Sequence, residues 1–282
     1  MVRDVYLGGM VSALRTDPFA GAILQVGVLA GLAGTVGLSA YGWLAGLLFG
    51  VVTVAALRYG LCRSGADRLG PADWVTLTRA TLTGGVFALT VDSFREPTVV
   101  PVLVVLSAVA LSLDWVDGQV ARRTGTASAL GARFDMEVDS FLVLVLCGYV
   151  ADQVGAWVLV IGAMRYVFVA AGWVLPWMRG SLPPRYWRKV VAATQGIALA
   201  VVAAGVLPRL PAVAVLLGAL ALLVESFGRD VGWLWRHRAR PAPRPVALPA
   251  APVSPAPALH RSEWTPGVRI TRQPAEAGGR RR

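Results

Sequence analysis

Long apolar stretches separated by short polar segments alternate along most of the chain. A helix that crosses a bilayer needs about 20 mostly apolar residues. The uncharged stretch from Phe19 to Leu57 is long enough for two such helices, with a break expected between Gly37 and Gly42, and a single span is the alternative. Six further apolar runs cover residues 74–91, 98–116, 134–151, 155–177, 189–207 and 211–230. The pattern predicts an all-α fold, a polytopic membrane helical bundle of eight transmembrane helices.

The two ends of the chain differ from this apolar region. In residues 1–18, apolar positions recur at helical spacing beside charged ones, which predicts a cytoplasmic segment that lies along the membrane surface or forms a plain solvated helix. No basic start leads directly into a short apolar core with a small-residue cleavage site, so we expect the first apolar span to stay in the mature protein. Residues 236–282 are rich in Pro, Ala and Arg, and we expect them to form a disordered basic cytoplasmic tail.

Composition and charge support a membrane protein and indicate its orientation. Of the 282 residues, 56% are hydrophobic and 15% are charged, which is unusually apolar for a soluble domain. The 27 basic residues, all arginine except Lys189, lie mostly in segments on one side of the alternating topology, with Arg95 and Arg209 on the other. This distribution predicts a multi-pass protein of the cell membrane with both termini in the cytoplasm, whose basic residues face lipid headgroups rather than nucleic acid. Cys62 and Cys147 have no metal-binding or redox spacing, and we expect no disulfide.

Four aspartates lie within the stretch DWVDGQVARRTGTASALGARFDMEVD, residues 114–139, at the cytoplasmic boundary between two predicted spans. On the first helix, one face at spacing i, i+3, i+4 and i+7 contains Asp114, Asp117, Gly118 and Ala121. On the second, a repeat of every four residues contains Gly131, Asp135 and Asp139. The carboxylates are therefore expected to converge, while the small residues leave room for a phosphate-sized ligand.

Such a cluster needs positive charge beside it, because carboxylates buried without partners cost several kcal/mol each. Arg122, Arg123 and Arg133 are one source of that charge. Divalent metals are the other, since Mg²⁺ and Mn²⁺ bind through a few carboxylates together with substrate phosphates. In a purely structural interpretation the acids cap helix ends and pair with arginines, but four acids in register with two glycines favour chemistry.

The spacing of these residues resembles the signature of the CDP-alcohol phosphatidyltransferase family, D-x-x-D-G-x-x-A-R-x8-G-x-x-x-D-x-x-x-D. The positions that match it are Asp114, Asp117, Gly118, Ala121, Arg122, Gly131, Asp135 and Asp139. Ser128 also stands where many members have a serine. Upstream, the segment from Asp73 to Thr76, followed by Arg79, is similar to the start of the family's first core helix, with Ala72 in place of the usual proline. A helix N-cap is the alternative role for Asp73.

The resemblance implies a membrane transferase of phospholipid biosynthesis that moves a phosphatidyl or related substituted phosphate group from a CDP-linked donor, such as CDP-diacylglycerol, to an alcohol and releases CMP. It also implies two divalent ions, Mg²⁺ or Mn²⁺, bound by Asp114, Asp117 and Asp135, with Asp139 a ligand of the second ion and the general base. The residues expected near the nucleotide or its phosphates are Asp73, Thr76, Gly118, Ala121, Arg122, Ser128 and Gly131.

In domain terms, the resemblance implies a six-helix core over residues 59–235, preceded by an extra transmembrane helix pair over residues 19–58. For this pair, packing against the core and a contact between subunits are the two interpretations, and a homodimer is a further expectation.

The alcohol acceptor is indicated only by charge. Arg165 lies inside an apolar run, where a charge is costly, so it is a candidate for binding substrate or for pairing with an aspartate. Arg185, Arg188 and Lys189 precede another span and would suit a phosphorylated or acidic acceptor, unless they are ordinary cytoplasmic loop charges. Glu225, Arg229 and Asp230 suggest a structural network at the end of the last helix.

Two rival functions also place acids in a membrane. An intramembrane prenyltransferase acting on a prenyl diphosphate carries two acidic motifs far apart in sequence, whereas both halves here lie within residues 114–139. A transporter that uses the acids as an ion site would have broken helices and would place the acids near the middle of the bilayer. The boundary position of the four aspartates favours the transferase.

Overall fold

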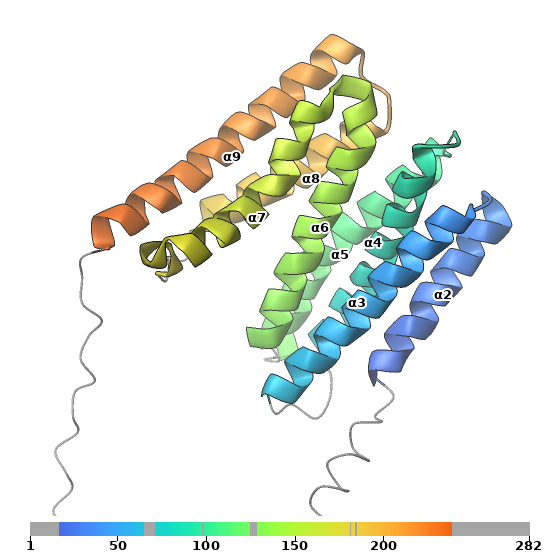
Figure 1. Cartoon of the computed structure of the whole chain (residues 1–282), viewed down its shortest axis with the longest axis horizontal. Coiled ribbons are helices and arrows are strands. Elements are labelled where there is room, and N and C mark those ends of the chain that lie inside the picture. Colours follow the sequence, from blue (N-terminus) through green and yellow to red (C-terminus); the bar gives the residue numbers. More distant parts are fainter. Residues whose placement is uncertain are drawn as a thin grey trace, which may run out of the picture. The chain divides into compact units, whose positions relative to one another are not determined.

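The computed structural model describes residues 17–64, 71–97, 99–124, 129–180, 182–183 and 185–238. Within these residues the fold is all-helical, with no strand, and the described helices belong to one compact unit that ends at Ala239 (Figure 1). The α-helices are α2 (Asp17–Thr35), α3 (Ala40–Ser64), α4 (Pro71–Ser93), α5 (Val100–Thr124), α6 (Ala129–Val154), α7 (Leu159–Val174), α8 (Tyr186–Ala203) and α9 (Arg209–His237). Two short 3₁₀ helices, Ala156–Val158 and Pro176–Arg179, flank α7.

Each of the eight apolar runs expected from the sequence coincides with one of these helices over most of its length. The expected break in the first stretch falls between Thr35 and Ala40, and Gly37 takes a left-handed φ of 76° there, which favours glycine. The stretch therefore forms two helices and not one. The segments 1–16 and 239–282, expected to be an interfacial segment and a tail, lie outside the described residues.

Three of the described helical segments are long and apolar enough to cross a membrane: Ala40–Arg63, Ala156–Val174 and Arg209–His237. The apolar parts of α2 and α5 are shorter, Ala20–Thr35 and Val100–Val116. In α5 the reason is local, because polar and charged residues fill the helix from Asp114 onward. Eight transmembrane passes, arranged as a core of six plus two, stay a prediction.

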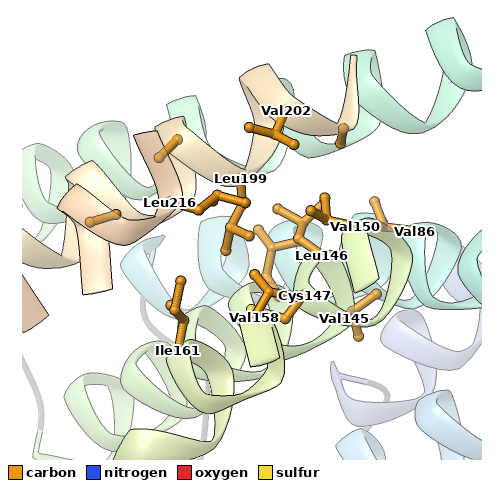
Figure 2. Packing of buried hydrophobic residues seen from close by; sticks show 14 of the residues in the cluster. Val86, Val145, Leu146, Cys147, Val150, Val158, Ile161, Leu199, Val202 and Leu216 are labelled. Carbon is orange, nitrogen blue, oxygen red and sulfur yellow. The ribbon is translucent and has the colours of Figure 1, made fainter. Parts of the chain in front are cut away.

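The main apolar core lies between α4, α5, α6, α8 and α9. In Figure 2, Leu146 and Val150 of α6 lie between Val86 of α4 and the pair Leu199 and Leu216, and all five are buried. Small residues let some of these helices approach closely. A methyl group at Gly162 of α7 would lie 2.6 Å from the backbone Cα of Leu144 in α6. Such close approach is typical of helix pairs in membranes, where packing replaces the hydrophobic effect as the driving force.

The first two described helices, α2 and α3, form a hairpin that packs along α4, in agreement with the interpretation that the extra pair packs against the core. At the loop between α2 and α3, the Ser39 amide donates a hydrogen bond to Asp92 of α4 at 2.9 Å, and the Ser39 hydroxyl bonds the same carboxylate. Midway along the hairpin, the buried Gln25 lies against Gly50 and Gly84, where added methyl groups would overlap its side chain. The hairpin is thus joined to α4 at two levels.

The close approach of α6 and α7 predicts opposite effects for two glycine substitutions. Gly162→Ala should destabilise the protein by about 1–3 kcal/mol, because the new methyl group meets backbone that has no room to move. Gly218→Ala, in open space on α9, should be neutral or stabilise it by up to about 1 kcal/mol. Thermal unfolding in detergent measures both. Equal stability of the two variants would contradict the close packing of α6 on α7.

Candidate active site

A buried arginine lies where α4, α5 and α6 meet. The side chain of Arg79, in α4, is only 1% exposed. Its guanidinium donates to Asp114 of α5 at 2.9 Å and also pairs with Asp135 and Asp139 of α6. We call these three aspartates the acidic cluster. The planar guanidinium suits this role because its several N–H donors reach carboxylates on different helices at once.

Local sequence explains how these residues meet. Asp135 and Asp139 are four residues apart, so they lie on one face of α6, near its beginning. Asp114 lies in the second half of α5, and only residues 125–128 separate the end of α5 from the beginning of α6. On α4, Asp73, Thr76 and Arg79 are spaced three residues apart, so each lies beside the next, with Asp73 and Arg79 about 120° apart around the helix axis.

The acidic cluster has the ligands that a hard divalent cation prefers. One carboxylate oxygen from each of Asp114, Asp135 and Asp139 lies within 4.8 Å of the others. Their side chains are between 35% and 43% exposed, so ions and substrate can reach them. Three ionised carboxylates beside one guanidinium leave an excess of two negative charges. Oxygen donors with that excess fit Mg²⁺ or Mn²⁺.

The remaining residues of the motif are placed only in part. Asp117, Gly118, Ala121 and Arg122 lie in α5, but their side chains are outside the described part of the structure, as are Arg123's side chain and the whole of Ser128. Gly131 lies in α6 one turn before Asp135 and is partly buried. The structure thus brings together three of the four aspartates and leaves the side chain of Asp117 undescribed.

In α4, Thr76 is buried and Asp73 is half-buried. The helix begins at Pro71, where the ring's fixed φ suits a first helical position. Asp73 therefore lies inside the first turn and does not precede it, so the N-cap alternative does not apply. Asp73 neighbours Thr76, which in turn neighbours Arg79, on the surface of α4.

The role of Arg79 was not expected from the sequence. Arg122, Arg123 and Arg133 were expected as counter-charges. Arg133 is exposed, the side chains of Arg122 and Arg123 lie outside the described residues, and the described partner of the cluster is Arg79. A usable signal was present, because Arg79 lies inside the apolar run 74–91, where a charge needs a partner. The same rule selected Arg165.

Arg165 pairs with a glutamate and not with one of the aspartates. Its guanidinium, on α7, binds Glu137 and lies 2.7 Å from the sulfur of Met136. Glu137 follows Asp135 by two residues, so it lies on nearly the opposite side of α6 from Asp135. Arg165 is therefore tied to the helix of the acidic cluster, on another face.

The basic residues at the beginning of α8, Arg185, Arg188 and Lys189, divide into two groups. Arg188 pairs with Asp230 of α9 at 3.6 Å, and the neighbouring Trp187 donates to Glu225 at 3.0 Å. Glu225 also pairs with Arg229 one turn later. These contacts make the network at the end of α9 that the sequence suggested, with Arg188 included. Arg185 and Lys189 are exposed.

The family model for CDP-alcohol phosphatidyltransferases matches residues 69–225 of this chain. The chain belongs to that family. No curated protein and no solved structure matches it. The match contains α4 to α8 and most of α9, together with Arg79 and the acidic cluster, whereas α2 and α3 precede it. Membership makes the protein a membrane transferase of phospholipid biosynthesis.

Arg79 as the counter-charge of the acidic cluster gives a prediction about stability. Arg79→Met keeps most of the side-chain length but removes the positive charge that the three half-exposed carboxylates share, which should cost about 1–3 kcal/mol in buffer with chelator. Added Mn²⁺ should recover part of that loss, since it restores positive charge. Thermal unfolding in detergent, with chelator and with Mn²⁺, measures both effects. Arg133→Met, at an exposed arginine, is the control and should change stability little. If both variants unfold alike without metal, Arg79 is not the counter-charge.

Proposed function

We propose that this member transfers a phosphatidyl group, or a related substituted phosphate, from a CDP-linked donor such as CDP-diacylglycerol to the hydroxyl of an alcohol. The observation that carries the proposal is the convergence of Asp114, Asp135 and Asp139 on the buried Arg79. The family match supports a CDP-linked donor over a prenyl diphosphate. In the reaction a P–O bond forms to the alcohol oxygen, the P–O bond to CMP breaks, and CMP leaves.

The aspartates have two tasks in this proposal. Asp114, Asp117, Asp135 and Asp139 hold two divalent ions, Mg²⁺ or Mn²⁺, which supply positive charge to the donor's pyrophosphate and to the attacking and leaving oxygens. Asp139 also takes the proton of the acceptor hydroxyl. Its side chain is 36% exposed, so an acceptor can reach it, and Arg79 holds it in place.

The donor's nucleotide lies beside the acidic cluster in this proposal. Asp73 neighbours Thr76, and Thr76 neighbours Arg79, on the surface of α4, which supports their contact with the cytidine or its phosphates. Gly118, Ala121 and Gly131 leave room for the diphosphate, and Arg122 and Ser128 bind it. An arginine suits this position because it presents paired N–H donors to phosphate oxygens.

The acceptor in this proposal is an alcohol with a negative charge, bound by Arg185 and Lys189. Helix register supports their position near the acidic cluster. A methyl group at Gly196 of α8 would meet Leu111 of α5, which fixes where these two helices cross. Lys189 lies seven residues before Gly196, roughly 10 Å along α8, and Asp114 is one turn from Leu111 on α5. Arg188 and Arg165, the other two acceptor candidates, already pair with acids, so in this proposal they hold the surrounding helices and do not bind the acceptor.

The role of Asp139 as base predicts the effect of its amide. Asp139→Asn should lower CMP release from CDP-diacylglycerol about 10²–10⁴-fold, because an amide cannot take the proton. The assay uses purified protein, Mn²⁺ or Mg²⁺ and a panel of alcohols, with liberated CMP as the signal. Asp152→Asn is the matched control, since Asp152 is exposed near the other end of α6. A wild-type protein that releases no CMP with any acceptor, and binds no CDP-lipid, would contradict the proposed function.

The acceptor site predicts a selective change in KM. Lys189→Gln should raise KM for phosphorylated alcohols about 10-fold or more, because a hydrogen bond to a charged group is lost. The KM for the CDP-lipid and for neutral alcohols should stay unchanged. Arg209→Gln, at the other end of the bundle from α8's first turn, is the control. Equal KM values for the two variants with every acceptor would exclude Lys189 from the site.

A further inference from the structure

Helix α3 lies outside the family match but packs against two helices that carry the candidate active site (Figure 1). Near its cytoplasmic end, Leu57 is 2% exposed and pairs with the fully buried Leu77 of α4. Leu61 and Phe134 pack against this pair. Leu77 comes two residues before Arg79, and Phe134 comes directly before Asp135. The apolar contact therefore adjoins the acidic cluster on both helices.

A second contact lies two helical turns along α6. The ring of Phe49, in α3, stacks on Phe141 of α6 with centroids 4.8 Å apart and an angle of 18° between planes. Phe87 of α4 meets Phe141 edge-on at 5.2 Å. Phe141 follows Asp139 by two residues. Aromatic pairs of this kind contribute about 0.5–1.5 kcal/mol beyond their buried area.

The two contacts bracket the aspartates of α6. On α6, Phe134 and Phe141 are seven residues apart, which is roughly 10 Å along the helix. On α3, which runs in the opposite direction, Leu57 and Phe49 are eight residues apart, roughly 12 Å. Asp135 and Asp139 lie between the two phenylalanines of α6. A displacement of α3 would therefore shift both aspartates relative to Arg79.

Helix α3 is itself held firmly. Ser39 fixes its beginning to Asp92 of α4, and Gln25 fills the space between Gly50 of α3 and Gly84 of α4. Close-packed interfaces of this kind transmit strain, since side chains in them cannot rearrange freely. The hairpin is thus joined to α4 along its whole length and to α6 at the segment that carries the acids.

We propose that α3 positions the acidic cluster, with Leu57 and Phe49 holding α4 and α6 at the separation at which Arg79, Asp135 and Asp139 converge. Both are positioning residues. Ligand sets for metals work only within about 0.5 Å of their proper geometry, so a small shift of α6 weakens metal binding. This role rests on the metal-dependent function proposed above. It gives the two helices before the family region a part in catalysis.

The test measures Mn²⁺ binding to the purified full-length protein in detergent by electron paramagnetic resonance, beside CMP release. Leu57→Ala and Phe49→Ala should each raise the Kd for Mn²⁺ about 10-fold, as changes behind metal ligands typically do. Leu57→Met conserves the side-chain volume, so its Kd for Mn²⁺ should equal that of the wild-type protein.

Leu29→Ala is the matched control, because Leu29 is fully buried against Gly46 within the hairpin. It should lower the unfolding temperature without changing the Kd. If Leu57→Ala does not fold, Phe49→Leu, which loses only the ring stack, replaces it.

The outcomes separate this inference from the proposed function. If Leu57→Ala and Phe49→Ala bind Mn²⁺ as tightly as Leu29→Ala does, α3 does not position the cluster, whatever the CMP assay gives. If Mn²⁺ binding weakens as expected but the wild-type protein releases no CMP, the positioning role stands and the transferase proposal fails. A wild-type protein that binds no Mn²⁺ contradicts both.

Discussion

The interaction on which the structure depends is the ion pairing of one buried guanidinium with carboxylates from two other helices. Arg79 alone, in α4, would be expensive to bury, and so would an acidic cluster with no positive charge beside it. The buried arginine and the acidic cluster each offset the other's cost of burial. The helices α4, α5 and α6 must therefore come together for these charged side chains to be stable inside the bundle. The arrangement thus specifies which helices meet and in what register, even where its net contribution to stability is small.

The same ion pairs leave the acidic cluster with an excess of negative charge. One guanidinium cannot balance three carboxylates, and the sequence adds Asp117 on the same helix. In the proposed reaction, this excess of negative charge on half-exposed oxygens is what would bind divalent cations and, through them, the donor's diphosphate. Arg79 then keeps the aspartates close before any ligand arrives, so less reorganisation is needed when a ligand binds. Preorganised charge of this kind is the usual means by which enzymes stabilise phosphoryl transfer.

The positions of the helices and the spacing of the aspartates could be predicted from the sequence, whereas the contacts between helices could not. Apolar runs locate the helices well, because a bilayer-sized helix must be apolar over most of its length, and the spacing of Asp135 and Asp139 places both on one face. Arg79 was missed because periodicity describes one helix at a time and does not say which helix faces which. The contacts of Phe49 with Phe141 and of Leu57 with Leu77 are hidden for the same reason. Each residue is an ordinary apolar side chain in an apolar run.

The surroundings of the cluster differ from one neighbouring helix to the next, and the difference bears on how substrates approach. Helix α3 meets α4 and α6 with leucine and phenylalanine side chains, which offer nothing to a charged alcohol. Helix α8 meets α5 and α6 and begins with basic residues, of which Arg185 and Lys189 are exposed. If the acceptor is acidic, as proposed, its charge would be balanced on the α8 side. The apolar contacts of α3 suit the positioning role proposed for it, since a metal ligand set tolerates only small displacements.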